Sequence, residues 1–157
     1  MQKNKSIVLI SPEPWNYIFV SKHYYAIELA QRGNIVFFLN PPGSQKDVTV
    51  TPIDLPYSIY TIDYSVNLKG QRFLPSFLSR AFDRLLFKKI ENTAGCKIDI
   101  IWNFENSRFY DFRFAPASVL KVYHQVDLNQ NFHVRAAAKT ADICFCTSVF
   151  IKERLLP

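Results

Sequence analysis

Residues 6–11, Ser-Ile-Val-Leu-Ile-Ser, form an apolar run that stops at the proline-rich segment 12–17, Pro-Glu-Pro-Trp-Asn-Tyr. A helical pattern of apolar residues follows over 21–33, and a second apolar run, 34–41, comes directly after it. Apolar runs without alternation are typical of strands that helices cover on both faces, so this order predicts a parallel βαβ unit. Because ligands of such sheets lie at the carboxyl ends of the strands, the loop 12–20 is the first place to expect a site.

The remainder of the chain continues the alternation of strands and helices. The expected elements are β-rich stretches at 48–54 and 57–64, a helix from 75 to about 92, strands at 98–104, 119–126 and 142–148, and helices at 133–140 and 149–155. The prolines in the first two stretches predict edge strands, and 65–74 is expected to be a loop. With right-handed crossovers, this order predicts an α/β fold: a Rossmann-like, doubly wound, mostly parallel sheet with helices on both faces. No internal boundary is visible, so residues 1–157 are expected to form a single domain.

Two helices carry more detailed signals. Ser21 is expected to be the N-cap of the first helix and Gly33 its C-terminal stop. In the long helix the apolar residues share one stripe, which is predicted to face the core: Leu78, Ala81, Phe82, Leu85 and Leu86. The opposite side of that helix carries Arg80, Arg84, Lys88 and Glu91.

The composition of the 157 residues is that of an ordinary globular protein, with 48% hydrophobic and 20% charged residues. The net charge of +6 favours anionic partners: nucleic acid, an anionic membrane surface or phosphorylated substrates. A solvated basic surface without a dedicated partner is the alternative. No Lys/Arg run is longer than two residues, and we expect no nucleic-acid partner.

The cysteines and the N-terminus bear on the compartment. Cys96, Cys144 and Cys146 make an odd count without a paired framework, so we expect small buried residues in a reducing cytoplasm. The first apolar stretch is too short for a signal peptide or a membrane span. A cytoplasmic protein is expected, with peripheral attachment to the inner face of the membrane as a further expectation.

Several cofactor and nucleophile motifs are missing from the sequence. It contains neither G-x-G-x-x-G nor G-x-x-x-x-G-K-[ST], and none of its four glycines follows the first strand, so a dinucleotide or P-loop phosphate cradle is not expected. A G-x-S-x-G nucleophile elbow is also missing. We expect no cofactor in this domain and no metal site.

The two candidate catalytic residues are His124 and Asp127, which come at and after the end of a predicted strand. A neutral imidazole could take a proton from a hydroxyl, and a carboxylate three residues on could orient it. The alternatives are a structural histidine that caps a backbone group and an aspartate that starts a loop or caps a helix.

The candidate substrate-binding residues follow other strand ends. Trp15 could stack on a sugar face or cover the end of the core. Glu105 could bind a substrate hydroxyl or act as a base, or be a solvated loop carboxylate. Ser148 could donate to a ligand or cap the last helix. The other candidates are Asn16, Tyr17 and Asn106.

Three stretches resemble sequences of GT-B-type glycosyltransferases. Residues 119–127, Val-Leu-Lys-Val-Tyr-His-Gln-Val-Asp, resemble the strand that ends Tyr-Asp-x-x-Asp or His-Asp in that family. Residues 139–156 resemble its segment ADxVxxxSxxLxxxL, and residues 26–41 resemble its opening ALAxRGHxVxxxxP. Taken together, the chain is similar to the N-terminal acceptor domain, one half of a GT-B fold, of a retaining, family-4-like glycosyltransferase of bacterial cell-wall or surface polysaccharide synthesis.

The resemblance implies a function for the whole enzyme. It would move a sugar from a nucleotide-sugar to a hydroxyl, with a glycan or a lipid-linked acceptor and an anionic membrane surface as partners. The nucleotide-sugar would be held by a C-terminal domain that residues 1–157 do not include, so this chain alone is expected to be inactive. His124 and Asp127 would face the transfer centre. The loop 12–17 departs from the family because it lacks the Gly-Gly pair whose amides approach the donor phosphate.

Two other readings remain open from the sequence. The chain could be half of a nucleotide-sugar epimerase of the same architecture, or a non-catalytic flavodoxin-like binding domain. A receiver domain is disfavoured, because Ser11 and Pro12 stand where an acidic pair would follow the first strand.

Overall fold

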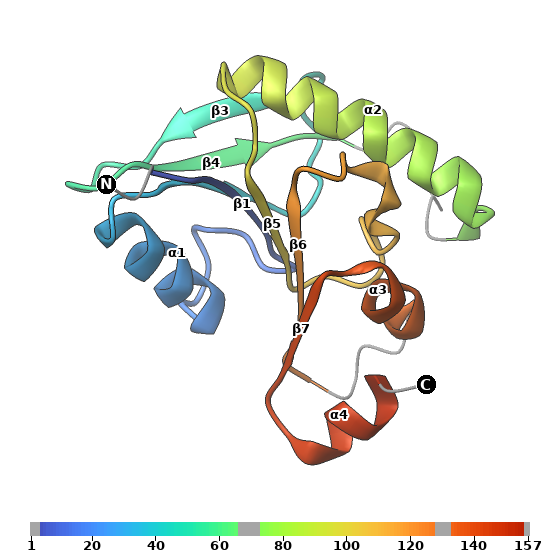
Figure 1. The fold of residues 1–157 in the computed structure, drawn as a ribbon. Helices are drawn as coiled ribbons and strands as arrows, with labels where there is room; N and C mark the ends of the chain where they lie inside the picture. Colours follow the sequence, from blue (N-terminus) through green and yellow to red (C-terminus); the bar gives the residue numbers. More distant parts are fainter. Residues whose placement is uncertain (1–3, 66–72, 128–132, 156–157) are drawn as a thin grey trace.

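The computed structural model describes residues 4–65, 73–127 and 133–155, which form a seven-stranded sheet with helices on both faces (Figure 1). The strands are β1 (Ser6–Ile10), β2 (Ile35–Leu39), β3 (Thr49–Pro52), β4 (Ile59–Asp63), β5 (Ile100–Asn103), β6 (Leu120–Gln125) and β7 (Ile143–Cys146). The helices are α1 (Ser21–Gln31), α2 (Ser76–Ala94), the 3₁₀ helix η2 (Phe112–Phe114), α3 (Val134–Thr140) and α4 (Val149–Leu155). The element order and the α/β, Rossmann-like class agree with the sequence prediction. The predicted loop 65–74 lies largely outside the described residues.

The strand order is β3-β4-β2-β1-β5-β6-β7, and every neighbouring pair is parallel except β3 with β4. Strand β3 lies at the edge and includes Pro52, as predicted, because a proline cannot donate to a ladder on both sides. Strand β4 was also predicted to be an edge strand, and this is wrong: it lies between β3 and β2. Its interrupting proline, Pro56, precedes the strand and so leaves the ladder intact.

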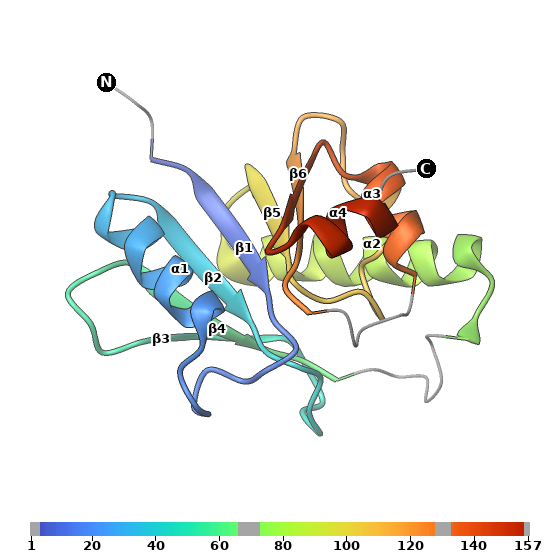
Figure 2. The same ribbon diagram turned by 90° about the horizontal axis from the view of Figure 1, so that it is seen from below.

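Alternation along the strands builds one core on each face. On the first face α1 packs through Ala26 and Ala30 against Leu9 of β1. On the other face Phe87 of α2 packs against Val8 of β1, together with η2 and α3. Figure 2, seen from below, places α1 in front of the sheet and α2 behind it. We refer to these as the α1 face and the α2 face.

The α1 face is only partly covered by the described helices. Helix α1 covers the part of the sheet around β1, β2 and β4, and α4 packs through Leu155 toward the core of the other face. Over β6 and β7 the apolar side chains on the α1 face remain partly open, with Leu120, Ile143 and Phe145 exposed to 38%, 41% and 44%. The sheet therefore has an accessible apolar area beside α1.

Helix α1 starts differently from the prediction. Its N-cap is Val20, and Ser21 is the first helical residue with no capping role. The His23 side chain contributes to capping the helix, because its Nδ1 accepts a hydrogen bond of 3.2 Å from the Val20 N–H. The C-terminal stop at Gly33 is confirmed, with φ of 86°, a left-handed conformation that suits glycine.

Helix α2 is rotated relative to the prediction. Most of the expected core stripe points outward, with Phe82 39% and Leu85 66% exposed, whereas Leu86 packs against the core as predicted. The buried side instead carries Ser79, Asp83, Phe87, Ile90 and Glu91. Apolar periodicity marks a helix side but not the direction in which that side points, and here polar residues of the buried side face the interior.

The cysteine prediction is also wrong in part. Cys144 is exposed, while Cys96 and Cys146 are half-buried and all three are free thiols. Cys144 is exposed because β7 is the edge strand of the sheet. Among the described residues, no helix is long and apolar enough to cross a membrane.

Candidate functional site

His124 lies in a cluster of aromatic rings on the α1 face. Its ring centroid is 4.7 Å from that of Phe104, 5.6 Å from those of Tyr25 and Phe145, and 6.2 Å from that of Trp102. We call these five residues the aromatic cluster. It joins α1, β5, β6, β7 and the residue after β5 near the carboxyl ends of the strands, where ligands of open α/β sheets bind.

Two buried nitrogen atoms of the aromatic cluster form no hydrogen bond with a described residue. Trp102 Nε1 and His124 Nδ1 are both buried, and no described residue accepts from or donates to them. A buried polar atom without a partner costs about 1–3 kcal/mol, and such atoms are uncommon in folded proteins. The indole can only donate, whereas the imidazole nitrogen donates or accepts according to its tautomer. This pair is therefore suited to a ligand that carries hydroxyl groups.

The surroundings keep His124 uncharged. Burial lowers the pKa of the imidazole below its ordinary value of 6.5, and the nearby Lys22 cation lowers it further. His124 is 7% exposed, and because its pKa lies below 6.5 the neutral form of the ring predominates at pH 7. A neutral imidazole can make a directional hydrogen bond to a hydroxyl, but a lowered pKa makes it a weaker base.

A buried ion pair holds the loop between β1 and α1. The Lys22 ammonium lies 2.5 Å from Glu13 Oε2, and the lysine side chain is only 7% exposed. The Glu13 backbone is fixed in turn by the Ser11 hydroxyl, which donates to the Glu13 carbonyl at 2.8 Å and accepts from its N–H at 3.1 Å. The sequence analysis did not identify Lys22. Its place at the start of the first helix, shortly after a loop that contains Glu13, could have suggested this ion pair.

A second polar group lies on the α2 face of the same strand ends, and its members are bonded to one another. The Asn106 amide donates to Tyr123 Oη and to Gln125 Oε1, both at 3.4 Å, and the Tyr123 hydroxyl donates to Gln125. Burial raises the pKa of Tyr123 to about 12. We call Asn106, Tyr123 and Gln125 the edge network. Because its members bond to one another, we assign the edge network a structural role.

Asn103 fastens the loop that follows β5. Its Oδ1 accepts from the Glu105 N–H at 2.7 Å, and its amide donates to the Phe109 carbonyl at 3.2 Å. Phe109 has φ of 53°, a left-handed conformation that a phenylalanine adopts rarely and that these bonds help to hold. Asn103 is fully buried.

Glu105 takes part in the same loop. Its Oε1 accepts from the Ser107 N–H at 2.7 Å, and its Oε2 lies 3.9 Å from the Arg108 guanidinium. Arg108 donates to the Tyr64 hydroxyl at 2.6 Å, and burial raises the pKa of Tyr64 to about 12. Glu105 is 8% exposed, so it is neither a solvated loop carboxylate nor open to a ligand in this arrangement.

The remaining predicted residues divide between core, cap and surface. Trp15 is buried, with its ring centroid 5.0 Å from that of Phe38, and it covers the end of the core. Ser148 Oγ accepts from the Ile151 N–H at 3.3 Å, which is the capping alternative. The exposed candidates are Asn16, Tyr17 and Asp127.

The predicted pairing of His124 with Asp127 is not present. His124 Nδ1 has no partner among the described residues, so the aspartate does not orient the ring through this nitrogen. The reason is local: Asp127 lies beyond the end of β6, exposed to solvent, whereas His124 points into the aromatic cluster.

The structure thus brings some of the predicted site residues together and separates others. Trp15 and Phe104 belong to the core of the α1 face, and His124 packs on Phe104, so Trp15 and His124 lie on the same face. Asn106, as a member of the edge network, lies on the α2 face instead. Sequence reasoning missed Trp102 and Phe145, which alternation along β5 and β7 places on the same face as His124.

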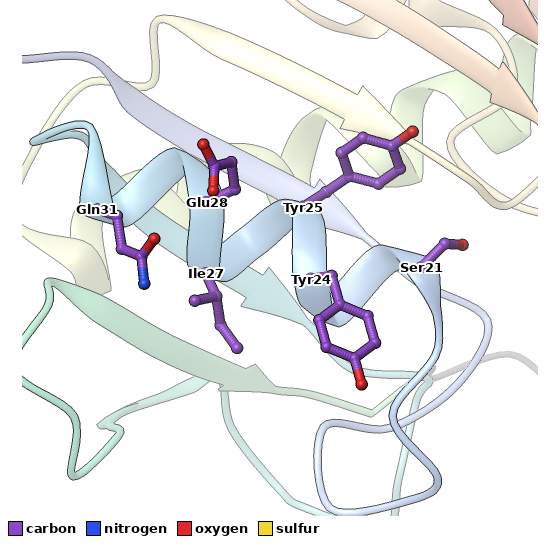
Figure 3. Close-up of a pocket in the computed structure, with 6 residues that line it drawn as sticks. All are labelled: Ser21, Tyr24, Tyr25, Ile27, Glu28 and Gln31. Carbon is purple, nitrogen blue, oxygen red and sulfur yellow. The ribbon is translucent and has the colours of Figure 1, made fainter.

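A pocket of about 520 Å³ lies along α1 and reaches the aromatic cluster through Tyr25 (Figure 3). Its lining residues are Ser21, Tyr24, Tyr25, Ile27, Glu28 and Gln31. Figure 3 shows Tyr24 and Tyr25 leaving α1 in different directions. Because Tyr25 is 38% exposed and contacts both the pocket and Trp102, it is the accessible rim of the cluster.

No protein-family model matches the chain, and no curated protein matches it significantly. Within the described residues, no three His, Cys, Asp or Glu side chains are grouped so that they could hold a metal ion.

Proposed function

We propose that this chain is the acceptor-binding domain of a glycosyltransferase that moves a sugar from a nucleotide-sugar to a hydroxyl of a glycan or a lipid-linked glycan. The resemblance of residues 119–127 and 139–156 to such enzymes supports the proposal. The observation that carries it is the pair of unpartnered nitrogen atoms, Trp102 Nε1 and His124 Nδ1, among aromatic rings at the carboxyl edge of the sheet.

The chemistry of the aromatic cluster suits a sugar. A pyranose ring has apolar C–H faces that pack on aromatic rings, and hydroxyls at its rim that both donate and accept hydrogen bonds. The Trp102 indole would donate to one hydroxyl oxygen, and the neutral His124 ring would bond a second hydroxyl. Tyr25 and Phe145, the exposed members of the cluster, would contact the sugar first.

His124 is better suited to binding than to proton removal. Because burial and Lys22 lower its pKa, the ring is a weaker base than an ordinary histidine. In a retaining transfer the departing phosphate can take the acceptor proton instead. We assign His124 the role of acceptor ligand, and the nucleotide-sugar is expected to bind to a second domain.

A binding experiment with the chain itself tests this proposal. Octyl β-glucoside below its micelle concentration serves as the probe, because it joins a sugar to a lipid-like tail, and calorimetry gives the affinity. Replacing Trp102 by Phe, or His124 by Phe, removes one neutral hydrogen bond and should weaken binding about three- to tenfold. The matched control is His133→Phe, because His133 stacks on Tyr110 at 3.8 Å, away from the cluster.

Two outcomes would contradict the proposal. The first is binding that falls equally in the His133 control, or that does not fall in either cluster variant. The second is multiple-turnover sugar transfer by the chain 1–157 alone from a nucleotide-sugar, since catalysis needs a donor site positioned against the acceptor.

A further inference from the structure

We infer that the outward side of α2 docks on an anionic lipid bilayer. The surface consists of Phe77, Leu78, Ala81, Phe82 and Leu85, with Phe73 just before the helix and Lys88 one turn beyond the apolar group. We call it the α2 docking surface. Helix α2 and helix α1 lie on opposite sides of the sheet (Figure 1), and the aromatic cluster is on the α1 face, so this surface is separate from the acceptor site.

The apolar part of this surface is large for a water-facing helix. Phe73, Phe77 and Leu85 are 74%, 60% and 66% exposed, and Leu78 and Phe82 are 38% and 39% exposed. The spacing i, i+4, i+8 of Phe77, Ala81 and Leu85 sets them in one row along the helix. A contiguous exposed apolar patch of this kind marks an interaction site more often than chance.

The charges of α2 are divided by sign between its two sides. Both of its carboxylates, Asp83 and Glu91, are buried, so its outward side carries no negative charge. Lys88 is exposed there and forms no ion pair with a described residue. Arg84 donates to the backbone carbonyls of Phe114 and Arg113, at 3.2 and 3.1 Å, and therefore keeps its full charge.

The neighbouring pairs do not cancel this positive charge. Arg80 and Arg113 share the single carboxylate of Asp111, at 3.1 and 2.7 Å, so one of these two charges stays unbalanced. Lys89 is neutralised individually, by Asp47 at 2.6 Å. The α2 docking surface is thus an apolar row bordered by excess positive charge.

The apolar row and the positive charge beside it together favour an anionic membrane as the partner of the α2 docking surface. An amphipathic helix with Phe and Leu on one side and Lys or Arg beside them lies in the interface of a membrane, where the cations meet anionic headgroups. A second copy of the chain is disfavoured, because facing surfaces would set positive charges against each other without a carboxylate to balance them.

The test is co-sedimentation of the chain with vesicles of phosphatidylcholine, with or without phosphatidylglycerol. We expect binding only to the vesicles that contain phosphatidylglycerol, and a clear loss of binding at high salt. Phe77→Ser should weaken it about tenfold, since a phenylalanine no longer enters the bilayer. Lys88→Glu should also weaken it at least fivefold, because one favourable charge becomes unfavourable.

Matched controls come from α4, which has an exposed Phe150 and an exposed Lys152. Phe150→Ser and Lys152→Glu should each leave vesicle binding within a factor of two, since both residues lie outside the α2 docking surface. The inference is overturned if the chain does not bind anionic vesicles, if it binds neutral vesicles equally, or if the α4 variants lose as much binding as the α2 variants. A concentration-dependent dimer that Phe77→Ser abolishes would overturn it as well, in favour of a second copy.

Discussion

The buried polar side chains of β5 and β6 differ between the two faces of the sheet. On the α2 face Asn106, Tyr123 and Gln125 bond to one another, and Asn103 fastens the loop after β5. On the α1 face Trp102 and His124 hold buried nitrogen atoms that bond to no described residue, although they belong to the same two strands, β5 and β6.

The difference shows which polar residues serve the fold and which are left for a ligand. A bonded buried network rigidifies the chain, and removing one member leaves its partners unsatisfied. An unpartnered buried atom stabilises nothing, so its presence calls for an explanation, and the one we propose is a ligand. The three predictions that follow test this difference by comparing the free energies of unfolding of variants on the two faces.

The largest effect is expected for Asn103→Ala on the α2 face. The substitution leaves the buried Glu105 N–H and Phe109 carbonyl without partners, so it should lower the free energy of unfolding by about 2–4 kcal/mol. Urea unfolding followed by circular dichroism measures this. A loss below about 0.5 kcal/mol would show that the loop does not depend on these bonds.

A much smaller effect, with either sign, is expected for His124→Phe on the α1 face. Phenylalanine is a flat ring only slightly larger than the imidazole and removes the unpartnered nitrogen, so the free energy of unfolding should change by less than about 1 kcal/mol. The same urea titration compares it with Asn103→Ala. Destabilisation comparable to that of the Asn103 variant would mean that His124 is structural, and the contrast between the faces would disappear.

The smallest effect concerns pH. Because the pKa of His124 is lowered in the folded state, the unfolded chain binds its proton more readily, so stability is complete above about pH 6.5 and declines as the pH falls below that value. Unfolding free energies measured from pH 7.5 to 5 should therefore decline less in His124→Phe than in the unchanged protein. Identical slopes would mean that burial does not lower this pKa.

Much of the fold could be predicted because its signals are local. The apolar runs and the turns gave the order of the elements, and Gly33 marked the end of α1. The direction in which α2 faces could not be predicted, because both of its sides carry apolar residues and tertiary packing decides between them. The interior position of β4 likewise depends on its pairing with β2, which no local signal encodes.

The candidate site was predictable only as a region. His124 was found through its place at a strand end, but the alternation that separates it from Asn106 and Gln125 needed the actual strand boundaries. Trp102 was missed because its position inside an apolar strand is typical of a core residue. The absence of a bond between His124 and Asp127 followed from the end of β6 at Gln125, which leaves the aspartate in solvent.

The most direct test uses the two tryptophans as probe and internal control. In a ¹H–¹⁵N correlation spectrum of the chain, each indole N–H gives one resonance, which Trp102→Phe assigns. On titration with octyl β-glucoside below its micelle concentration, we predict that the Trp102 resonance shifts saturably, while that of Trp15, which is packed against Phe38 in the core, stays in place. A Trp102 resonance that does not move, or equal shifts of both, would contradict the claim that the unpartnered nitrogen atoms of the α1 face await a sugar.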